Sequence, residues 1–289
     1  MMKRILTLLI FLCVNCCTLA QNVSEPSSKM HPEWSKPYPP FQIAGNLYYV
    51  GTYDLACYLI VTPKGNILIN TGLASSGQLI KTSIESLGFK LTDTRILLTT
   101  QAHFDHMGAM AELKRLTGAK MMVDEGDAAV VADGGLSDYD LQGKVCVFKP
   151  VKVDRILHNG DSIMLGGMKL TTLHHPGHTK GSCSYLFDVQ DNDRKYSVLI
   201  ANMPTIVTDK KFADVLAYPN IANDYAYTLN AMKHITFDIW LASHASQFNL
   251  TDKHQPGTAY NPGAFMDKKY YYDKIDDLRK EYDSKVNSK

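Results

Sequence analysis

The sequence lacks a charge excess of either sign. Its 289 residues include 30 Lys and Arg against 29 Asp and Glu, so the formal net charge is +1. Such a balance gives no electrostatic reason to bind nucleic acid or an anionic membrane surface, and we expect neither as a partner. The hydrophobic fraction of 45% and the charged fraction of 20% exclude a disordered or fibrous chain.

A long hydrophobic run is also missing. The apolar stretch at residues 5–12 is too short to span about 30 Å of hydrocarbon, and no later segment supplies about 20 consecutive apolar residues. Lys3 and Arg4 precede this stretch and Ala20 ends a small-residue site, so residues 1–20 are predicted to be a cleaved signal peptide. We therefore expect a mature protein in the periplasm, with no stable membrane association.

Two other interpretations of the N-terminus fit less well. An ordinary buried helix would not need a basic pair before the apolar stretch and small side chains after it. A lipid anchor on Cys16 or Cys17 would need a suitable preceding residue, and Asn15 and Cys16 are poor ones. Lipoprotein anchoring is therefore the weaker alternative.

Paired cysteines are absent as well. Three of the six cysteines would leave with the signal peptide, and the remaining three are an odd number without C-x-x-C spacing: Cys57, Cys146 and Cys183. This pattern excludes a disulfide framework. One pair could form in an oxidising compartment, but a chain of this length buries enough surface without it. We expect all three to be small buried side chains on strands.

The hydrophobic pattern divides the chain into a leader, an arm and a core. Residues 21–40 are polar and rich in proline, which predicts an N-terminal arm, and residues 41–289 are predicted to form a single domain. Short β-prone runs at residues 47–50, 57–61 and 66–70 predict an antiparallel meander. Further strands are predicted at residues 96–98, 145–148, 163–165, 168–173, 183–187 and 196–201.

Helical patterns lie between these runs. One follows Ser76 and stops at Gly88, a second stops at Gly118, a third covers about residues 224–233, and a C-terminal pattern places Tyr271 and Ile275 on one face. Strand-rich halves interleaved with helices predict two sheets packed face to face with helices outside.

Metal-binding side chains follow the predicted strand at residues 96–98. His103, Asp105 and His106 fall within four consecutive positions, and further histidines lie at residues 174–178 and at residue 244, each group after an apolar run. Zinc takes histidine nitrogen and aspartate oxygen as ligands, and strand ends can meet at one edge of a sheet pair. The pattern therefore predicts a metal centre rather than a solvated polar loop.

These segments resemble those of a known family. Q-A-H-F-D-H at residues 101–106, G-H-T-K-G-S at 177–182 and A-S-H at 242–244 stand in the order typical of the metallo-β-lactamase superfamily. The chain is most similar to the third subclass of metallo-β-lactamases and its GOB-type branch, in which glutamine replaces the first histidine. The resemblance implies an α/β (α+β) fold, an αββα sandwich of two mixed β-sheets with outer helices. Asn70 stands where the family usually has aspartate.

The resemblance also implies two zinc positions. The ligands of the first would be Gln101, His103 and His178, and those of the second would be Asp105, His106 and His244. An amide oxygen is a weaker ligand for zinc than imidazole, so we expect one or two ions, with the second position the tighter.

The function implied by the resemblance is hydrolysis of the β-lactam amide bond of penicillins, cephalosporins and carbapenems, giving antibiotic resistance. Zinc lowers the pKa of bound water from 15.7 to about 7, so metal-bound hydroxide would attack without an acyl-enzyme. Asp105 would orient that water, and Lys180 and Thr205 are candidates to hold the substrate carboxylate. Met203 stands where many relatives have a serine near the second metal.

Other functions fit the same motifs. Another hydrolase of this fold, acting on lactones or thioesters, would need the same metal ligands. A non-catalytic metal-binding scaffold is a further alternative, against which five intact family ligands argue. Export and the glutamine-bearing motif favour the lactamase. We expect a monomer, because no exposed apolar stripe is identifiable in the sequence.

Overall fold

The computed structural model describes residues 23–26, 29–143 and 146–287. The predicted signal peptide at residues 1–20 lies outside this part of the chain. Among the described residues, no helix is both long and apolar enough to cross a membrane.

Seven strands of the described chain form the first sheet, in the order β1 to β7. β1 to β4 pair antiparallel, and β5, β6 and β7 are added in parallel, so the sheet is mixed. The predicted antiparallel meander is confirmed. The strands are β1 (Phe41–Ala44), β2 (Leu47–Tyr49), β3 (Tyr58–Thr62), β4 (Gly65–Ile69), β5 (Thr94–Leu98), β6 (Lys120–Asp124) and β7 (Arg155–Leu157).

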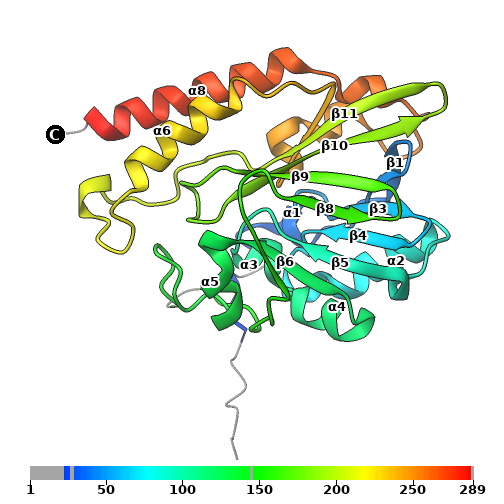
Figure 1. Cartoon of the computed structure of the whole chain (residues 1–289), viewed down its shortest axis with the longest axis horizontal. Helices are drawn as coiled ribbons and strands as arrows, with labels where there is room; N and C mark the ends of the chain where they lie inside the picture. The colour runs from blue at the N-terminus through cyan, green and yellow to red at the C-terminus, as the bar shows by residue number, and fades with distance from the viewer. Residues whose placement is uncertain (1–22, 27–28, 144–145, 288–289) are drawn as a thin grey trace, which may run out of the picture.

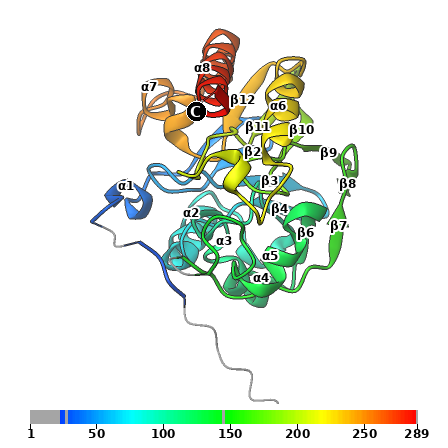
Figure 2. The same ribbon diagram turned by 90° about the vertical axis from the view of Figure 1, so that its left-hand side faces the viewer.

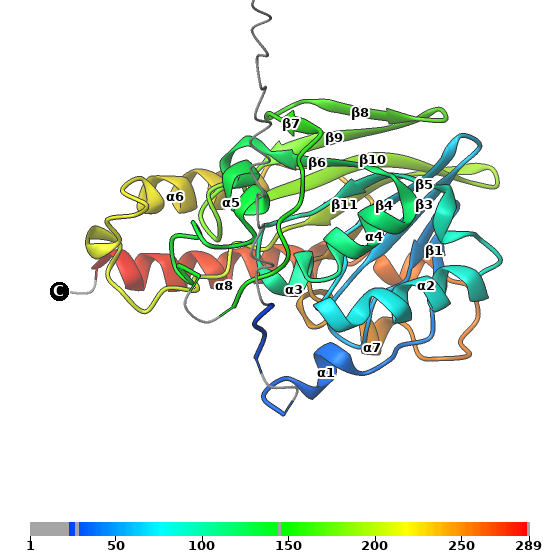
Figure 3. The same cartoon turned by 90° about the horizontal axis from the view of Figure 1, so that it is seen from below.

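The second sheet contains five described strands in the order β12-β11-β10-β9-β8. β8 to β11 pair antiparallel, whereas β12 lies parallel to β11, so this sheet is mixed too. The strands are β8 (Ser162–Leu165), β9 (Met168–His174), β10 (Cys183–Asp191), β11 (Arg194–Ala201) and β12 (Ile239–Ala242). β7 and β8, the edge strands of the two sheets, lie on the same side of the molecule (Figure 3).

Helices cover the outer face of each sheet, as Figures 1 and 2 show. α2 (Gly77–Ser86), α4 (Met110–Thr117) and α5 (Ala128–Asp133) lie on the first sheet, and α6 (Ile221–Met232) and α8 (Lys268–Asn287) lie on the second. Short helices α1 (Pro32–Ser35), α3 (Phe104–Met107) and α7 (Leu250–Lys253) lie in the connections. The αββα sandwich implied by the resemblance is therefore confirmed.

The strands of the first sheet are apolar on both faces because each face packs against a different core. In β4, Ile67 and Ile69 belong to the core between the sheets, whereas Leu68 packs under the helices. Alternate side chains of a strand point to opposite faces, so the continuous apolar run satisfies both cores. The same pattern in β5 places Leu98 between the sheets and leaves the loop after it at their edge.

Two predicted details of secondary structure have different outcomes. The strand predicted at residues 145–148 is wrong for its described residues, because Val147 makes only an isolated bridge with Ser24 of the N-terminal arm. Apolar character there reflects burial under the first sheet's helices, since Cys146 and Phe148 belong to that core. The predicted stop at Gly118 is confirmed, where φ is +67° and a residue without Cβ is favoured.

The three cysteines outside the predicted leader are free and buried. Cys57 and Cys183 lie beside or within strands, and burial raises the pKa of both thiols above the ordinary value. The prediction of small buried side chains is confirmed, whereas their predicted placement on strands holds only for Cys183, because Cys57 directly precedes β3 and Cys146 lies outside the strands.

Candidate metal centre

Three loops at one end of the two sheets carry the predicted ligands. Gln101 and His103 follow β5, with Asp105 and His106 in the short helix α3 directly after them. His178 lies in the loop from β9 to β10, and His244 comes two residues after β12. The backbone N–H of Cys183 donates to the Thr100 carbonyl over 2.9 Å, which joins the first two loops across the sheets.

The side chains predicted for the second position lie together. Asp105 Oδ2 is 3.3 Å from His106 Nε2 and 3.3 Å from His244 Nε2. One potential ligand atom from each of these residues lies within 4.8 Å of the others. Asp105 and His106 are buried, and His244 is partly exposed. A carboxylate oxygen and two imidazole nitrogens at this spacing form a donor set that zinc accepts.

The side chains predicted for the first position also meet. The rings of His103 and His178 have their centroids 4.9 Å apart, and both are buried. Gln101 is 3% exposed, and its Oε1 has no hydrogen-bond partner among the described residues. Both ring nitrogens of His106 likewise lack a partner with hydrogen-bond geometry. Buried polar atoms normally have hydrogen-bond partners, so these unpartnered oxygen and nitrogen atoms are consistent with ligands to a bound cation.

Outer partners orient three of the four histidines. Asp54 Oδ2 lies 3.0 Å from His244 Nδ1, and Asp138 Oδ2 lies 3.3 Å from His103 Nε2, within ion-pair distance although without hydrogen-bond geometry. His178 Nδ1 donates to the carbonyl oxygen of Thr205 over 2.8 Å. Such partners fix the ring and the tautomer, leaving the other nitrogen for a metal.

Protonation states at neutral pH suit metal binding at several of these groups. Burial alone would raise the pKa of Asp105, but the His106 and His244 rings beside it hold that pKa well below its usual range. Burial, reinforced by His103, lowers the pKa of His178 to about 3. An ionised carboxylate and neutral imidazole are the ligand forms.

His244 differs because it sits between two carboxylates. Burial opposes its protonation, yet the hydrogen bonds to Asp105 and Asp54 raise its pKa to about 9. A metal at the second position must therefore displace a proton from this ring, which couples binding to pH.

Of the two candidate substrate contacts, Thr205 touches the candidate ligand His178, and Lys180 is partly exposed two residues after it. Thr205 directs both its carbonyl oxygen and its hydroxyl toward His178 Nδ1, at 2.8 and 3.0 Å. The Lys180 ammonium lies 5.6 Å from the centroid of the Tyr218 ring. Met203 and Thr205 line a cavity of about 200 Å³ against α8.

The neighbouring histidines have other partners. His174 Nδ1 lies 2.9 Å from Asp124 Oδ2, and His175 Nδ1 lies 2.7 Å from the Ser184 hydroxyl. Ser184 also accepts from the Asn202 backbone N–H over 3.0 Å. These side chains are engaged in contacts that stabilise the loop from β9 to β10, so His178 is the candidate metal ligand of this loop.

Sequence reasoning missed three buried aspartates around the centre. Asp54 and Asp138 contact candidate ligand histidines, and Asp127 accepts hydrogen bonds from two of the three loops that carry candidate ligands. Burial raises the pKa of Asp127 to about 6. None of the three stands at a recognisable spacing from a ligand, so only the fold brings them to the site.

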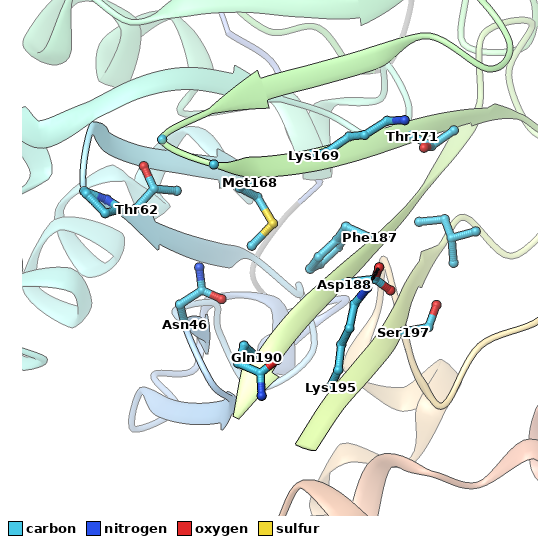
Figure 4. A pocket seen from close by; sticks show the side chains of 14 residues that line it. Asn46, Thr62, Met168, Lys169, Thr171, Phe187, Asp188, Gln190, Lys195 and Ser197 are labelled. Atoms are coloured by element: carbon cyan, nitrogen blue, oxygen red, sulfur yellow. Dashed lines mark ion pairs between the residues drawn. The ribbon is translucent and has the colours of Figure 1, made fainter. Parts of the chain in front are cut away.

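A larger hollow lies elsewhere in the described part of the molecule. A hollow of about 710 Å³ lies at the opposite strand ends, where side chains of β9, β10 and β11 meet the turns at Asn46 and Thr62 (Figure 4). Its charged groups include the ion pair of Lys195 with Asp188, 2.7 Å apart. It contains neither a histidine nor a cysteine among its lining residues. The chemistry of the donor set, and not cavity size, identifies the candidate site.

Comparisons with known proteins agree with this geometry. A family model described as the metallo-beta-lactamase superfamily matches residues 51–191. The solved class B3 di-zinc metallo-beta-lactamase LRA-12 from an Alaskan soil metagenome is 63% identical, over 92% of this chain and 100% of that one, with a TM-score of 0.89. The metallo-beta-lactamase GOB-18 from Elizabethkingia meningoseptica is 57% identical, over 92% and 98% of the two chains, with a TM-score of 0.91.

A more distant relative matches over a shorter region. A hydroxyacylglutathione hydrolase from Bradyrhizobium sp. (strain BTAi1) is 30% identical over 131 residues, which are 45% of this chain and 42% of that protein. The chain thus spans less than half the length of this curated relative, whereas it spans the class B3 enzymes almost end to end. The chain belongs to the metallo-β-lactamase superfamily, and within it to the class B3 metallo-β-lactamases beside the GOB-type branch.

Proposed function

We propose that this protein is a periplasmic zinc enzyme that hydrolyses the β-lactam amide bond and thereby gives resistance to penicillins, cephalosporins and carbapenems. One observation carries the proposal: similarity to class B3 enzymes over nearly the whole chain coincides with a converging donor set that includes the buried, unpartnered Oε1 of Gln101. Export follows from the leader pattern at residues 1–20.

Each zinc position would take three protein ligands. Gln101, His103 and His178 would hold the first, and Asp105, His106 and His244 would hold the second. The second set contains an anionic carboxylate and two imidazoles, so it binds more tightly than the first, whose amide oxygen is neutral and weakly basic.

Bound zinc supplies a water nucleophile at neutral pH and positive charge for the nitrogen released from the ring. Asp105 remains ionised, because the adjacent imidazoles hold its pKa low. Its carboxylate accepts a hydrogen bond from the attacking water and so aims the water at the carbonyl carbon. Lys180 and Thr205 bind the carboxylate of the substrate and fix its orientation.

No serine nucleophile is needed in this mechanism. The Ser182 hydroxyl bonds to the backbone N–H and the hydroxyl of Thr179, at 2.9 and 2.8 Å. The Ser184 hydroxyl bonds to His175 and to the Asn202 backbone. Both serines are buried. Both hydroxyls are engaged in these contacts, Ser182 at the end of the loop and Ser184 in β10, and the attack would proceed without an acyl-enzyme.

The test is hydrolysis of one penicillin, one chromogenic cephalosporin and one carbapenem by the purified mature chain, with and without a chelator. S-lactoylglutathione serves as the thioester control, because a relative is a hydroxyacylglutathione hydrolase. We expect β-lactam turnover that chelation abolishes and added zinc restores. Thioester turnover without β-lactam turnover would favour the other hydrolase, and zinc binding without either would indicate a scaffold.

Location and assembly are tested separately. Mass analysis of the N-terminus of periplasmic material should give a chain that begins at Gln21. A retained leader or a diacylglyceryl cysteine would contradict the proposed export route. Light scattering should give a monomer.

A further inference from the structure

One buried carboxylate touches both loops that carry the ligands of the first position. Asp127 ends the short 3-10 helix Glu125–Asp127, directly after β6. Its Oδ2 accepts hydrogen bonds from the backbone N–H of Ala102, at 2.8 Å, and from the Thr179 hydroxyl, at 2.7 Å. Its Oδ1 accepts from the backbone N–H of Gly181, at 2.9 Å. The side chain is 1% exposed.

The donors to Asp127 lie next to the proposed ligands in the sequence. Ala102 stands between Gln101 and His103, and Thr179 follows His178. A shift of Asp127 would therefore move all three ligands of the first position relative to one another. Hydrogen bonds to a charged acceptor are about twice as strong as neutral ones, so the three hydrogen bonds to Asp127 hold the two loops firmly in place.

Two glycines allow the segment that carries Asp127 to approach the loop that carries His178. A Cβ on Gly181 would lie 2.2 Å from the backbone nitrogen of Asp127, and a Cβ on Gly126 would lie 2.2 Å from the carbonyl oxygen of Lys180. Real Cβ atoms do not approach so closely. The segment that carries Asp127 is thus in backbone contact with the loop that carries His178.

The second position has different supports. The carbonyl oxygen of His106 accepts from the Thr71 backbone N–H, at 2.9 Å, and hydroxyl, at 3.0 Å. Asp54 holds His244 through Nδ1 and also accepts from the backbone N–H of Ser246, at 2.9 Å. Neither support involves Asp127. The two positions therefore have separate buried carboxylates behind them.

From this arrangement we propose that Asp127 is a positioning residue that sets the metal affinity of the first position and leaves the second unchanged. The inference rests on the ligand sets given under the proposed function. The first position depends on such a support because its amide ligand binds weakly, so that affinity must come from ligands already held in place.

The experiment compares D127N with D54N, two substitutions of equal size, one behind each proposed position. In D127N, the amide nitrogen must face at least one of the three donors, so a hydrogen bond becomes a donor–donor contact. Zinc titration against a chromophoric chelator gives the two stepwise constants. Anomalous diffraction at the zinc edge, on crystals equilibrated at graded zinc concentrations, gives the occupancy of each position.

We expect D127N to weaken the first position by about 10- to 100-fold, the usual effect of losing an outer-shell partner, with the second unchanged. D54N should show the reverse pattern. T179V removes one of the three hydrogen bonds and should weaken the first position by a smaller factor; it carries the same test if D127N does not fold. A merely structural role for Asp127 would weaken both positions equally.

Equal losses at both positions, or no loss at either, would overturn the inference. These outcomes are distinguishable from failure of the proposed function, because metal affinity is measured without any substrate. A wild-type chain that binds no zinc would overturn the ligand sets themselves. A wild-type chain that binds two zinc ions but cleaves no β-lactam would overturn only the proposed substrate.

Discussion

Replacing Gln101 with histidine tests the proposed asymmetry between the two metal positions. The side chain is 3% exposed, and its Oε1 has no partner among the described residues, so a ligand at this position is already desolvated. Imidazole is a more basic donor to zinc than an amide oxygen. We expect the first position to tighten at least about tenfold, which corresponds to about 1.4 kcal/mol.

The gain has an upper limit that the structure explains. Ligand histidines here have outer partners, such as Asp54 for His244 and the Thr205 carbonyl for His178. The Gln101 side chain has no hydrogen-bond partner of this kind among the described residues. A new imidazole at this position would therefore enter without an outer partner already paired to its second nitrogen. Missing partners of this kind cost about 10- to 100-fold in metal affinity, so part of the gain is lost.

Competition titration of zinc against a chelator, run on both proteins, measures the effect. Q101M, which keeps the length but offers only a weak thioether, is the matched control and should weaken the first position. The second position should keep its affinity in all three proteins. Equal affinities for both zinc ions in the unaltered chain, or no change in Q101H, would show that the amide is an adequate ligand or lies outside the coordination shell.

Three further substitutions test other parts of the account. D105N should nearly abolish turnover, because it removes an anionic ligand and the acceptor for the attacking water; wild-type kinetics at saturating zinc would exclude that role. Burial lowers the pKa of His175 to about 3, so between about pH 6.5 and pH 3 the imidazole takes up a proton in the unfolded chain but not in the folded one. Urea unfolding of the metal-free protein should therefore show a free energy of unfolding that decreases as the pH is lowered, by up to about 1.4 kcal/mol per pH unit from this group, with a shallower decrease in H175Q. G181A should lose about 1–3 kcal/mol of stability through overpacking against Asp127, unlike G263A at an exposed position of the 3-10 helix Pro262–Phe265; equal losses would contradict the close approach.

The fold was predictable, and the candidate ligands could be singled out, because both signals are local. Apolar runs such as residues 96–98 mark strands buried on both faces, and the histidines stand directly after such runs. The failure at residues 145–148 has a physical reason too. The neighbours Cys146 and Phe148 are apolar because they pack in the core under the first sheet's helices, and the one bridge partner of the buried Val147, Ser24, lies far away in the sequence. Burial and strand pairing are not distinguishable from a short apolar run.

The supports behind the ligands were not predictable for a different reason. Three single acidic residues support the candidate ligands, and each does so through a partner that is distant in the sequence. Asp54 contacts His244, 190 positions away, and Asp138 contacts His103, 35 positions away. Asp127 contacts Ala102 and Thr179. Long-range hydrogen bonds leave no spacing in a single sequence. Only the packing of the two sheets brings these carboxylates to the metal centre.

Asn70 illustrates how such a contact explains a departure from the family pattern. Its Oδ1 accepts from the Thr100 backbone N–H, at 2.9 Å, and its Nδ2 donates to the Thr100 hydroxyl, at 3.1 Å, and to the Ala56 carbonyl, at 3.4 Å. The Thr100 hydroxyl in turn contacts that of Ser243, at 2.9 Å, one residue before His244. Aspartate would supply the acceptor but not the donor. The residue also has φ of +61°, a conformation that asparagine tolerates well. An amide at this position therefore joins the ends of β4, β5 and β12 beneath the metal centre without adding a buried negative charge to it.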